Sequence, residues 1–253
     1  MRLNKFIAGA TGLSRREADD LIARGRVSVN DQPARLGLRL RDDDVDVVRL
    51  DNQILHLPLQ HTLIMMNKPR GYVSSRRAQA QHAHTLYELL PDQYARLKTI
   101  GRLDRDSSGL ILLNDDGDLA FRLTHPKFAK SKTYLVRLDK GLTPDQQRLI
   151  AERGVELPDG PSRLQLVLID QRSELSDHDF SALKTAQKVD FGAREIWRVQ
   201  MSEGRNRQIR RTFSALGYNV ERLHRIEFGE YMLGDLEFGE IRAIKAISTD
   251  EKR

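Results

Sequence analysis

A single carboxylate, Asp104, is the residue of this chain whose neighbours best suit it to chemistry. It lies in the segment 101–117, GRLDRDSSGLILLNDDG, within a Gly-Arg-Leu-Asp turn. A short Ser-Ser-Gly turn follows, and the apolar run Leu110 to Leu113 predicts a buried strand that the Asp-Asp-Gly behind it ends. A carboxylate between two turns and beside a buried strand is held rigidly, and its loop can open onto a cleft. We therefore expect a reacting group here.

The same segment resembles the catalytic motif of the RsuA-type family of ribosomal RNA pseudouridine synthases, which includes RluB, RluE and RluF. That motif runs Gly-Arg-Leu-Asp, two free positions, Thr or Ser, one free position, then Gly-Leu and a leucine-rich strand. The matching residues here are Gly101, Arg102, Leu103, Asp104, Ser107, Gly109 and Leu110. Where the family continues Thr-Asn-Asp-Gly, this chain has Asn-Asp-Asp-Gly at 114–117. The resemblance implies a cofactor-free enzyme that detaches uracil from ribose, rotates it and reattaches it through carbon.

The resemblance makes Asp104 the required carboxylate. It could attack the ribose C1′ or abstract the C2′ proton, and the sequence leaves both routes open. Either route needs an ionised Asp104, so a cationic partner is expected beside it. Arg210 matches the last arginine of the family's Gly-Arg…Gln-Ile-Arg motif, which pairs with the aspartate. Helical periodicity puts Arg210 at the border of an apolar face, whereas Arg207 and Arg211 point away, toward phosphates.

Three further residues acquire roles from the resemblance. Tyr134 matches the tyrosine of a Lys-x-Tyr strand that packs against the target base and can help to move a proton. Arg102, which precedes the aspartate by two residues, fills the gap that a flipped-out uridine leaves in the RNA. Leu223 lines the base pocket. The alternatives are a core tyrosine, a loop-bracing arginine and a core leucine.

Two basic islands on a balanced chain indicate contact with a polyanion. The net charge is only +6, yet residues 1–41 hold nine Lys/Arg against four Asp/Glu, and residues 204–225 hold six Arg against one Glu. Such clustering is typical of nucleic-acid footprints, although solvated surface charge is the alternative for any one arginine. The arginines expected to bind RNA are Arg15, Arg16, Arg24, Arg26, Arg102, Arg205, Arg207 and Arg211.

Residues 1–48 predict a separate small module. Ser14 and Glu17 form a capping box at a helix start, and Gly25 is a natural helix stop. Val27–Val29 and Val45–Val48 read as short strands. The module resembles the S4 RNA-binding domain through its turn at 25–31, GRVSVND, with Asp in the place of the usual Gly. The resemblance implies that the arginine-bearing helix docks on RNA phosphates.

The rest of the chain predicts a second, larger domain. Residues 49–60 read as a linker, and residues 61–248 as the catalytic domain. Strands and helices do not alternate regularly there, which favours an α+β fold with a mostly antiparallel mixed sheet. Expected strands are 63–66, 132–138, 163–169 and 194–201, and expected helices 119–123, 144–153 and 206–216. Residues 171–190 read as an exposed insertion.

Composition narrows the class of protein. At 253 residues, with 31% charged residues and no cysteine, the chain predicts a globular cytoplasmic protein without disulfides or thiol nucleophiles. No apolar stretch approaches the ~20 residues that cross a bilayer. We expect no metal, a monomer, and ribosomal RNA as partner, with the large subunit slightly favoured and transfer RNA open.

Two alternatives belong to other classes of protein. One is an RNA-binding ribosome-assembly factor or chaperone without catalysis. The other is a calcium-binding protein, because residues 104–115 approach the spacing of a calcium loop, although Leu112 stands where a ligand is needed.

Overall fold

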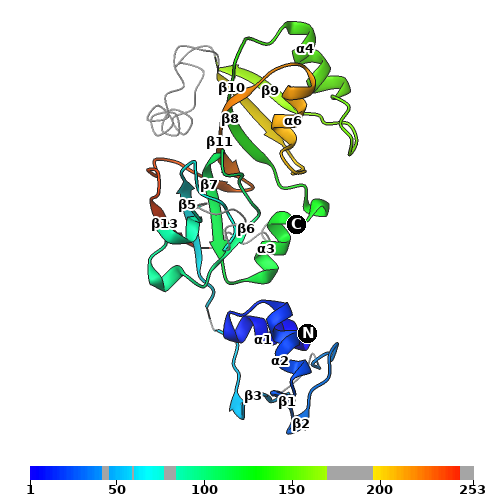
Figure 1. The fold of residues 1–253 in the computed structure, drawn as a ribbon, viewed down its shortest axis with the longest axis vertical. Helices are drawn as coiled ribbons and strands as arrows, with labels where there is room; N and C mark the ends of the chain where they lie inside the picture. The colour runs from blue at the N-terminus through cyan, green and yellow to red at the C-terminus, as the bar shows by residue number, and fades with distance from the viewer. Residues whose placement is uncertain (42–45, 59, 77–83, 170–195, 246–253) are drawn as a thin grey trace. The chain divides into compact units, whose positions relative to one another are not determined.

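The chain forms two compact units, which are described separately. The computed structural model describes residues 1–41, 46–58, 60–76, 84–169 and 196–245. The first unit comprises Met1–Thr62, Arg96–Lys98 and Asn114–Gly117; the second comprises Leu63–Ala95, Thr99–Leu113 and Asp118–Arg253 (Figure 1). Residues 171–190, the predicted insertion, lie outside the described residues. No helix in the described ranges is long and apolar enough to cross a membrane.

The first unit packs two helices on a small sheet. Its helices are α1 (Leu3–Thr11) and α2 (Arg15–Ala23), and its strands β1 (Val27–Val29), β2 (Gln32–Pro33), β3 (Val48–Leu50) and β4 (Gln53–Ile54) lie in the order β2-β1-β3-β4. The predicted capping box is confirmed, since Ser14 N donates to Glu17 Oε2 at 2.7 Å and Glu17 N to Ser14 Oγ at 3.2 Å. A core including Ile7, Ala18 and Val48 joins the helices to the sheet.

Two expected boundaries in this unit need correction. The strand expected at Val45–Val48 instead runs from Val48 to Leu50, and Val45 lies outside the described residues. The segment 49–60, expected as a linker, supplies the rest of β3 and all of β4, which pairs with β3 through Arg49 and Ile54. Both residues of β4 are exposed, so no buried alternation marks this strand in the sequence.

The described residues of the second unit are built on a nine-stranded sheet. The order β13-β5-β7-β11-β8-β10-β9 has β12 beside β11 and β6 beside β7. The strands are β5 (Leu63–Lys68), β6 (Lys98–Ile100), β7 (Ser108–Asn114), β8 (Lys132–Leu138), β9 (Gln165–Ile169), β10 (Ile196–Met201), β11 (Val220–Phe228), β12 (Tyr231–Met232) and β13 (Ile241–Ile244). The predicted α+β class with a mostly antiparallel sheet is confirmed, with β7 and β11 as a parallel pair.

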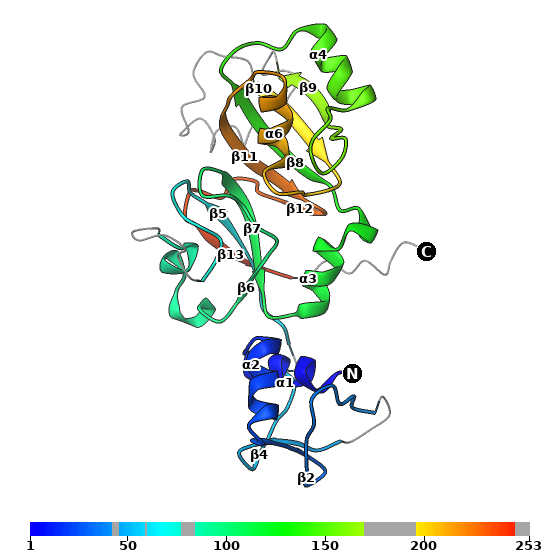
Figure 2. The ribbon, with the colours of Figure 1, turned by 45° about the vertical axis from the view of Figure 1, so that its right-hand side comes forward.

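Helices and short helical turns complete the second unit. They are η1 (Leu86–Leu89), η2 (Asp92–Tyr94), α3 (Gly117–Thr124), η3 (Pro126–Phe128), α4 (Pro144–Arg148), η4 (Leu149–Arg153) and α6 (Gln208–Ala215). Helix α6 lies against the face formed by β8, β10 and β11 (Figure 2). Every residue of β5 and β7 is buried, as expected for central strands covered on both faces.

Strands β7, β11 and β8 meet at one level. Gly109 of β7 stands in register with Arg225 of β11, and Arg225 with Tyr134 of β8. Gly109 has φ +105°, and a Cβ built there would lie 2.2 Å from the carbonyl oxygen of Arg225. Only glycine permits this approach, since the site requires both a positive φ and the absence of a side chain.

Replacement of Gly109 by Ala should therefore destabilise the protein by about 3 kcal/mol or more, because the methyl group clashes with backbone that cannot move independently. Urea unfolding measures the effect. Gly117→Ala is the control: a Cβ there meets nothing within 4 Å, so its change should stay within about 0.5 kcal/mol. Equal stabilities for the two variants would contradict the close contact.

His224 is a buried titratable side chain beside this contact. It is 1% exposed, its Nδ1 lies 2.9 Å from Ser108 Oγ, and burial lowers its pKa to about 4. The folded protein therefore keeps His224 neutral at pH values where the unfolded chain, with an ordinary pKa near 6.5, already binds a proton.

Because the folded pKa is depressed, the stability contributed by neutral His224 is present above about pH 6.5 and is lost as the pH falls toward 4. Between pH 7.5 and 4.5 the wild-type protein should lose about 2 kcal/mol more stability than His224→Gln, which keeps a hydrogen-bonding group without a titrating one. Urea unfolding at both pH values measures this difference. Parallel losses in the two proteins would count against a neutral buried imidazole.

Candidate active site

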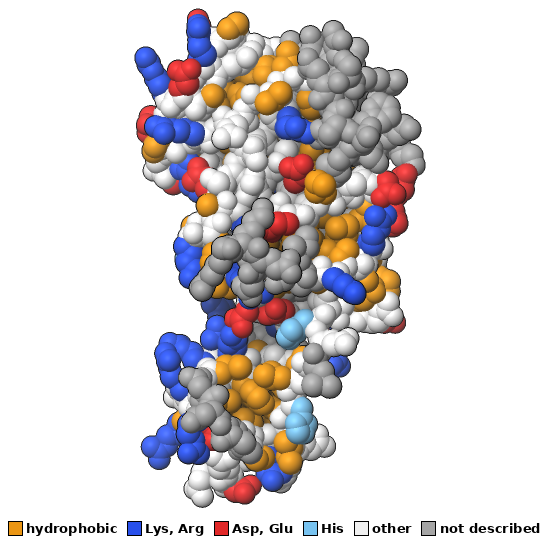
Figure 3. All heavy atoms as spheres, turned by 180° about the vertical axis from the view of Figure 1, so that it is seen from behind, with side chains coloured by type: hydrophobic (Ala, Val, Ile, Leu, Met, Phe, Trp, Pro, Cys, Tyr) orange, Lys and Arg blue, Asp and Glu red, His pale blue; other side chains and the backbone are white. Residues whose placement is uncertain are grey.

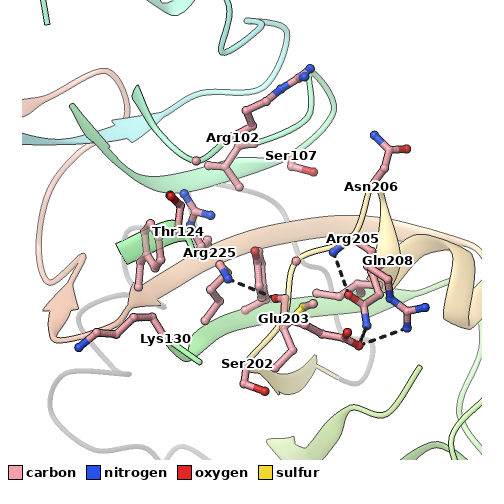
Figure 4. Close-up of a pocket in the computed structure, with 18 of the residues that line it drawn as sticks. Arg102, Ser107, Thr124, Lys130, Ser202, Glu203, Arg205, Asn206, Gln208 and Arg225 are labelled. Carbon is pink, nitrogen blue, oxygen red and sulfur yellow. Dashed lines mark hydrogen bonds and ion pairs between the residues drawn. The ribbon is translucent and has the colours of Figure 1, made fainter. Parts of the chain in front are cut away.

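A cavity of about 570 Å³ opens on the second unit and has Asp104 in its wall. Its floor is the face of β8, β10 and β11 that carries Tyr134, Met201 and Leu223. The walls come from the turn at 101–107, from 123–130 and from the segment 202–209 that leads into α6 (Figure 4). The volume lies within the range of ligand-binding pockets.

The turn that carries Asp104 is braced by a buried serine. Ser74 Oγ donates to the carbonyl of Leu103 at 2.8 Å and accepts from Leu103 N at 3.1 Å, so one hydroxyl satisfies both backbone groups of the residue before Asp104. On the other side, Gly71 N donates to Arg105 O at 2.8 Å. The carboxylate of Asp104 therefore sits on fixed backbone, while its side chain remains 30% exposed.

Lys68 places a buried positive charge behind this turn. It is 0% exposed, and its Nζ donates to Pro69 O at 2.9 Å and to Ser107 O at 2.8 Å. Burial lowers the pKa of Lys68 to about 8, and the carboxylates of Asp104 and Asp106 oppose that shift. Lys68 belongs to the Asn-Lys-Pro turn, whose sequence marks a turn but does not indicate a buried ammonium.

The cation beside Asp104 is Arg207, which differs from the sequence-based expectation. Arg207 Nη1 lies 3.5 Å from Asp104 Oδ2, and the same guanidinium makes a two-point pair with Asp106 at 3.1 and 3.2 Å. Arg210, the expected partner of Asp104, instead contacts Asp106: its Nη2 donates to the Asp106 carbonyl at 3.0 Å, and its Nε lies 3.3 Å from Oδ2. Arg207 thus occupies the place beside Asp104 that was expected for Arg210.

Asp106 links the two arginines. Burial opposes its ionisation, but the hydrogen bonds from Arg207 and the charges of Arg210 and Arg207 outweigh that effect and hold the pKa of Asp106 below its usual value. Asp106 therefore stays charged and orients Arg207 toward Asp104. A third contact fixes Arg210, whose Nη1 donates to Val220 O at 2.7 Å.

The other two arginines of this segment bind the protein itself. Arg205 donates to the carbonyls of Asp159, Gly160 and Pro161 at 2.7 to 2.9 Å. Arg211 makes a two-point pair with Asp159 at 2.8 and 3.1 Å. These contacts account for both side chains structurally, and their predicted role in RNA binding stays a prediction.

The remaining predicted residues occupy two places. Tyr134, Leu223 and Arg102 all line the cavity; Tyr134 and Leu223 are buried in its floor, and Arg102 is exposed at its edge. In the first unit Arg15, Arg16, Arg24 and Arg26 are exposed, and Arg26 Nε donates to Asp51 at 2.9 Å. Basic side chains stand out on the face of this unit in Figure 3.

The structure adds three cavity-lining cations to those predicted, namely Lys130, Lys132 and Arg225. Arg225 is 1% exposed and Lys132 is half-buried. In the sequence Arg225 reads as one more basic residue, because its position depends on the pairing of β11 with β7 and β8.

Residues 104–115, which approach the spacing of a calcium loop, do not form a calcium site. Ser108–Asn114 form strand β7, and Ser108 Oγ is engaged with His224. In the described part of the chain, no three His, Asp or Glu side chains gather in a way that could hold a metal ion.

Comparisons with known proteins agree with this geometry. A family model described as RNA pseudouridylate synthase matches residues 62–215, and an S4 domain model matches residues 1–46. Ribosomal large subunit pseudouridine synthase B of Vibrio cholerae is 36% identical over 92% of this chain and 67% of its own length. Ribosomal small subunit pseudouridine synthase A of Pasteurella multocida is 33% identical over 97% of both chains.

Among solved structures, one titled as a pseudouridylate synthase is similar with a TM-score of 0.62 and 31% identity, over 97% of this chain and 96% of the other. The predicted resemblance to the RsuA-type enzymes is confirmed. The chain therefore belongs to the RNA pseudouridine synthases and carries an N-terminal S4 domain.

Proposed function

We propose that this enzyme converts one specific uridine of ribosomal RNA into pseudouridine, with Asp104 as the reacting carboxylate. The observation that carries the proposal is the position of Asp104: a rigid turn holds it in the wall of an open cavity, 3.5 Å from a guanidinium. Its partial exposure lets a nucleotide reach it, with the guanidinium of Arg207 beside it.

The residues of the cavity suggest how the substrate is held. A uridine buried in a folded RNA must leave its stack to reach Asp104, and Arg102 at the cavity edge can occupy the vacated position. The buried side chains of Tyr134 and Leu223 in the cavity floor then receive the base. The carboxylate would attack C1′ or remove the C2′ proton, and this arrangement is compatible with both routes.

Ribosomal RNA is proposed as the substrate because the similar enzymes are named for the ribosome. Those named for the large subunit include relatives from Vibrio cholerae and Bacillus subtilis at 36% and 32% identity, which favours the large subunit. The S4 domain would bind the RNA through Arg15, Arg16 and Arg24, which are exposed on or next to α2. We propose that the enzyme acts in the cytoplasm as a monomer.

Asp104→Asn should abolish pseudouridine formation, with a loss of about 10³-fold or more, because the amide can neither attack nor accept the proton. Pseudouridine mapping of total RNA from cells that carry either form measures the loss and identifies the uridine. RNA affinity should change less than about threefold, since the exposed arginines are untouched. An active Asp104→Asn enzyme would exclude Asp104 as the reacting group.

Asp106→Asn should lower the rate constant at saturating RNA by about tenfold to a hundredfold, because Arg207 loses the charge that holds it beside Asp104. Asp159→Asn is a matched control: it also removes a carboxylate that pairs with two arginines of the same segment, but those arginines do not touch Asp104. Single-turnover kinetics should show the loss in the first variant only. Similar rates in both would mean that the network is merely structural.

A further inference from the structure

Arg225 carries a buried charge whose bonds within the protein leave part of the guanidinium unused. Its Nε donates to Leu110 O at 2.7 Å, which anchors the side chain on β7. Its Nη2 is buried without a hydrogen-bond partner, and no carboxylate among the described residues pairs with it. Since a buried, unpaired guanidinium is costly, such a group calls for an explanation in terms of function.

The register of the sheet places the Arg225 side chain on the face that lines the cavity. Arg225 stands directly opposite Tyr134 in the antiparallel pair of β11 and β8, so their side chains share one face. Leu223, two residues earlier on the same strand, shares that face too. All three line the cavity that holds Asp104. A base that lies on Tyr134 and Leu223 therefore meets Arg225.

A second cation stands next to Arg225. Lys132 is two residues before Tyr134 on β8, and its Nζ donates to Glu203 O at 3.2 Å, a neutral carbonyl. Both cations flank one aromatic ring: Arg225 Cζ lies 5.0 Å and Lys132 Nζ 5.4 Å from the centroid of Phe228. Burial and the charge of Arg225 lower the pKa of Lys132, and the carboxylate of Glu203 opposes that shift. Glu203 also lines the cavity, but its carboxylate accepts hydrogen bonds from Arg205 and Gln208, so the floor around Arg225 and Lys132 carries an excess of positive charge.

We propose that Arg225, assisted by Lys132, binds the carbonyl oxygens of the target pyrimidine and stabilises the negative charge of the base while it is detached from ribose. This inference rests on the proposed function. When the C1′–N1 bond breaks, its electron pair leaves with N1 and spreads onto O2 and O4. Once C5 has bonded to C1′, C5 loses its proton and N1 gains one, so the reaction is an isomerisation. Fixed positive groups in a water-poor site stabilise such a developing charge strongly.

The symmetry of the pyrimidine explains how one fixed cation can serve both ends of the reaction. A half turn about the line from N3 to C6 exchanges N1 with C5 and, at the same time, O2 with O4. Arg225 would therefore face one carbonyl before the rotation and the other after it. The base keeps its polar contact throughout, and only the atom presented to C1′ changes.

Arg225→Lys and Arg225→Met test the assignment in single-turnover reactions with an RNA fragment that contains the mapped uridine. We expect the rate constant to fall by about a hundredfold in Arg225→Met and less in Arg225→Lys, with RNA affinity within about threefold of wild type. Arg222→Met is the control, because Arg222 lies on the same strand but does not line the cavity, and its rate should change less than about threefold. An unchanged rate in Arg225→Met would overturn the assignment.

A second arm separates a role in the reaction from a role in folding. The target uridine is replaced by 2-thiouridine or 4-thiouridine, whose sulfur accepts hydrogen bonds poorly. If Arg225 binds each carbonyl in turn, a sulfur in the substrate and Arg225→Lys in the enzyme remove the same interaction. The loss in rate constant with both changes together should therefore be smaller than the product of the two separate losses, by about fivefold or more. Fully independent losses would overturn the inference. Failure of the wild-type enzyme to convert the unmodified fragment would instead overturn the proposed function itself.

Discussion

The close parallel contact of β7 and β11 at Gly109 is the constraint on which the site depends. It brings the strand that follows Asp104 against the strand that carries Leu223 and Arg225, at a distance that no other residue than glycine allows. Arg225 then fastens the two strands through Leu110 O. The reacting carboxylate and the floor of the cavity are therefore parts of one rigid sheet, which suits an enzyme that must hold a loose base in place while it turns.

Electrostatics supplies the second constraint. Around Asp104 the protein gathers Lys68, Arg207 and Arg210, and it balances them with Asp106 and several carbonyls. Backbone carbonyls hold Lys68, and Asp106 holds Arg210; among the described residues, Arg207 is the cation that pairs with the Asp104 carboxylate. Within the described ranges Arg225 and Lys132 form no ion pair with a carboxylate, and the Glu203 carboxylate, which also lines the cavity, is bound by Arg205. The site thus presents Asp104 to the sugar and an excess of positive charge to the base.

The sequence predicts what local interactions determine. The capping box of Ser14 and Glu17 and the strand 132–138 follow from neighbours in the chain, and both appear as expected. The sequence could not predict that Arg207 rather than Arg210 lies beside Asp104, because the helical pattern assumed a helix from residue 206. Arg207 has φ +48°, so α6 begins only at Gln208 and the Arg207 side chain leaves the direction that periodicity assigns to it. Arg225 was missed since its place depends on strands far apart in sequence.

The same distinction explains the two basic islands. Along the chain they look alike, but in the structure they differ, because Asp106 and Asp159 hold four arginines of the second island, 205, 207, 210 and 211, in intramolecular pairs. These arginines form a framework for the cavity wall. Arg15, Arg16 and Arg24 are exposed instead, and Arg102 reaches solvent at the cavity edge. Contact with RNA phosphates should therefore depend mainly on the first island, and the charges of the second on where the uridine is held rather than on how tightly the RNA binds.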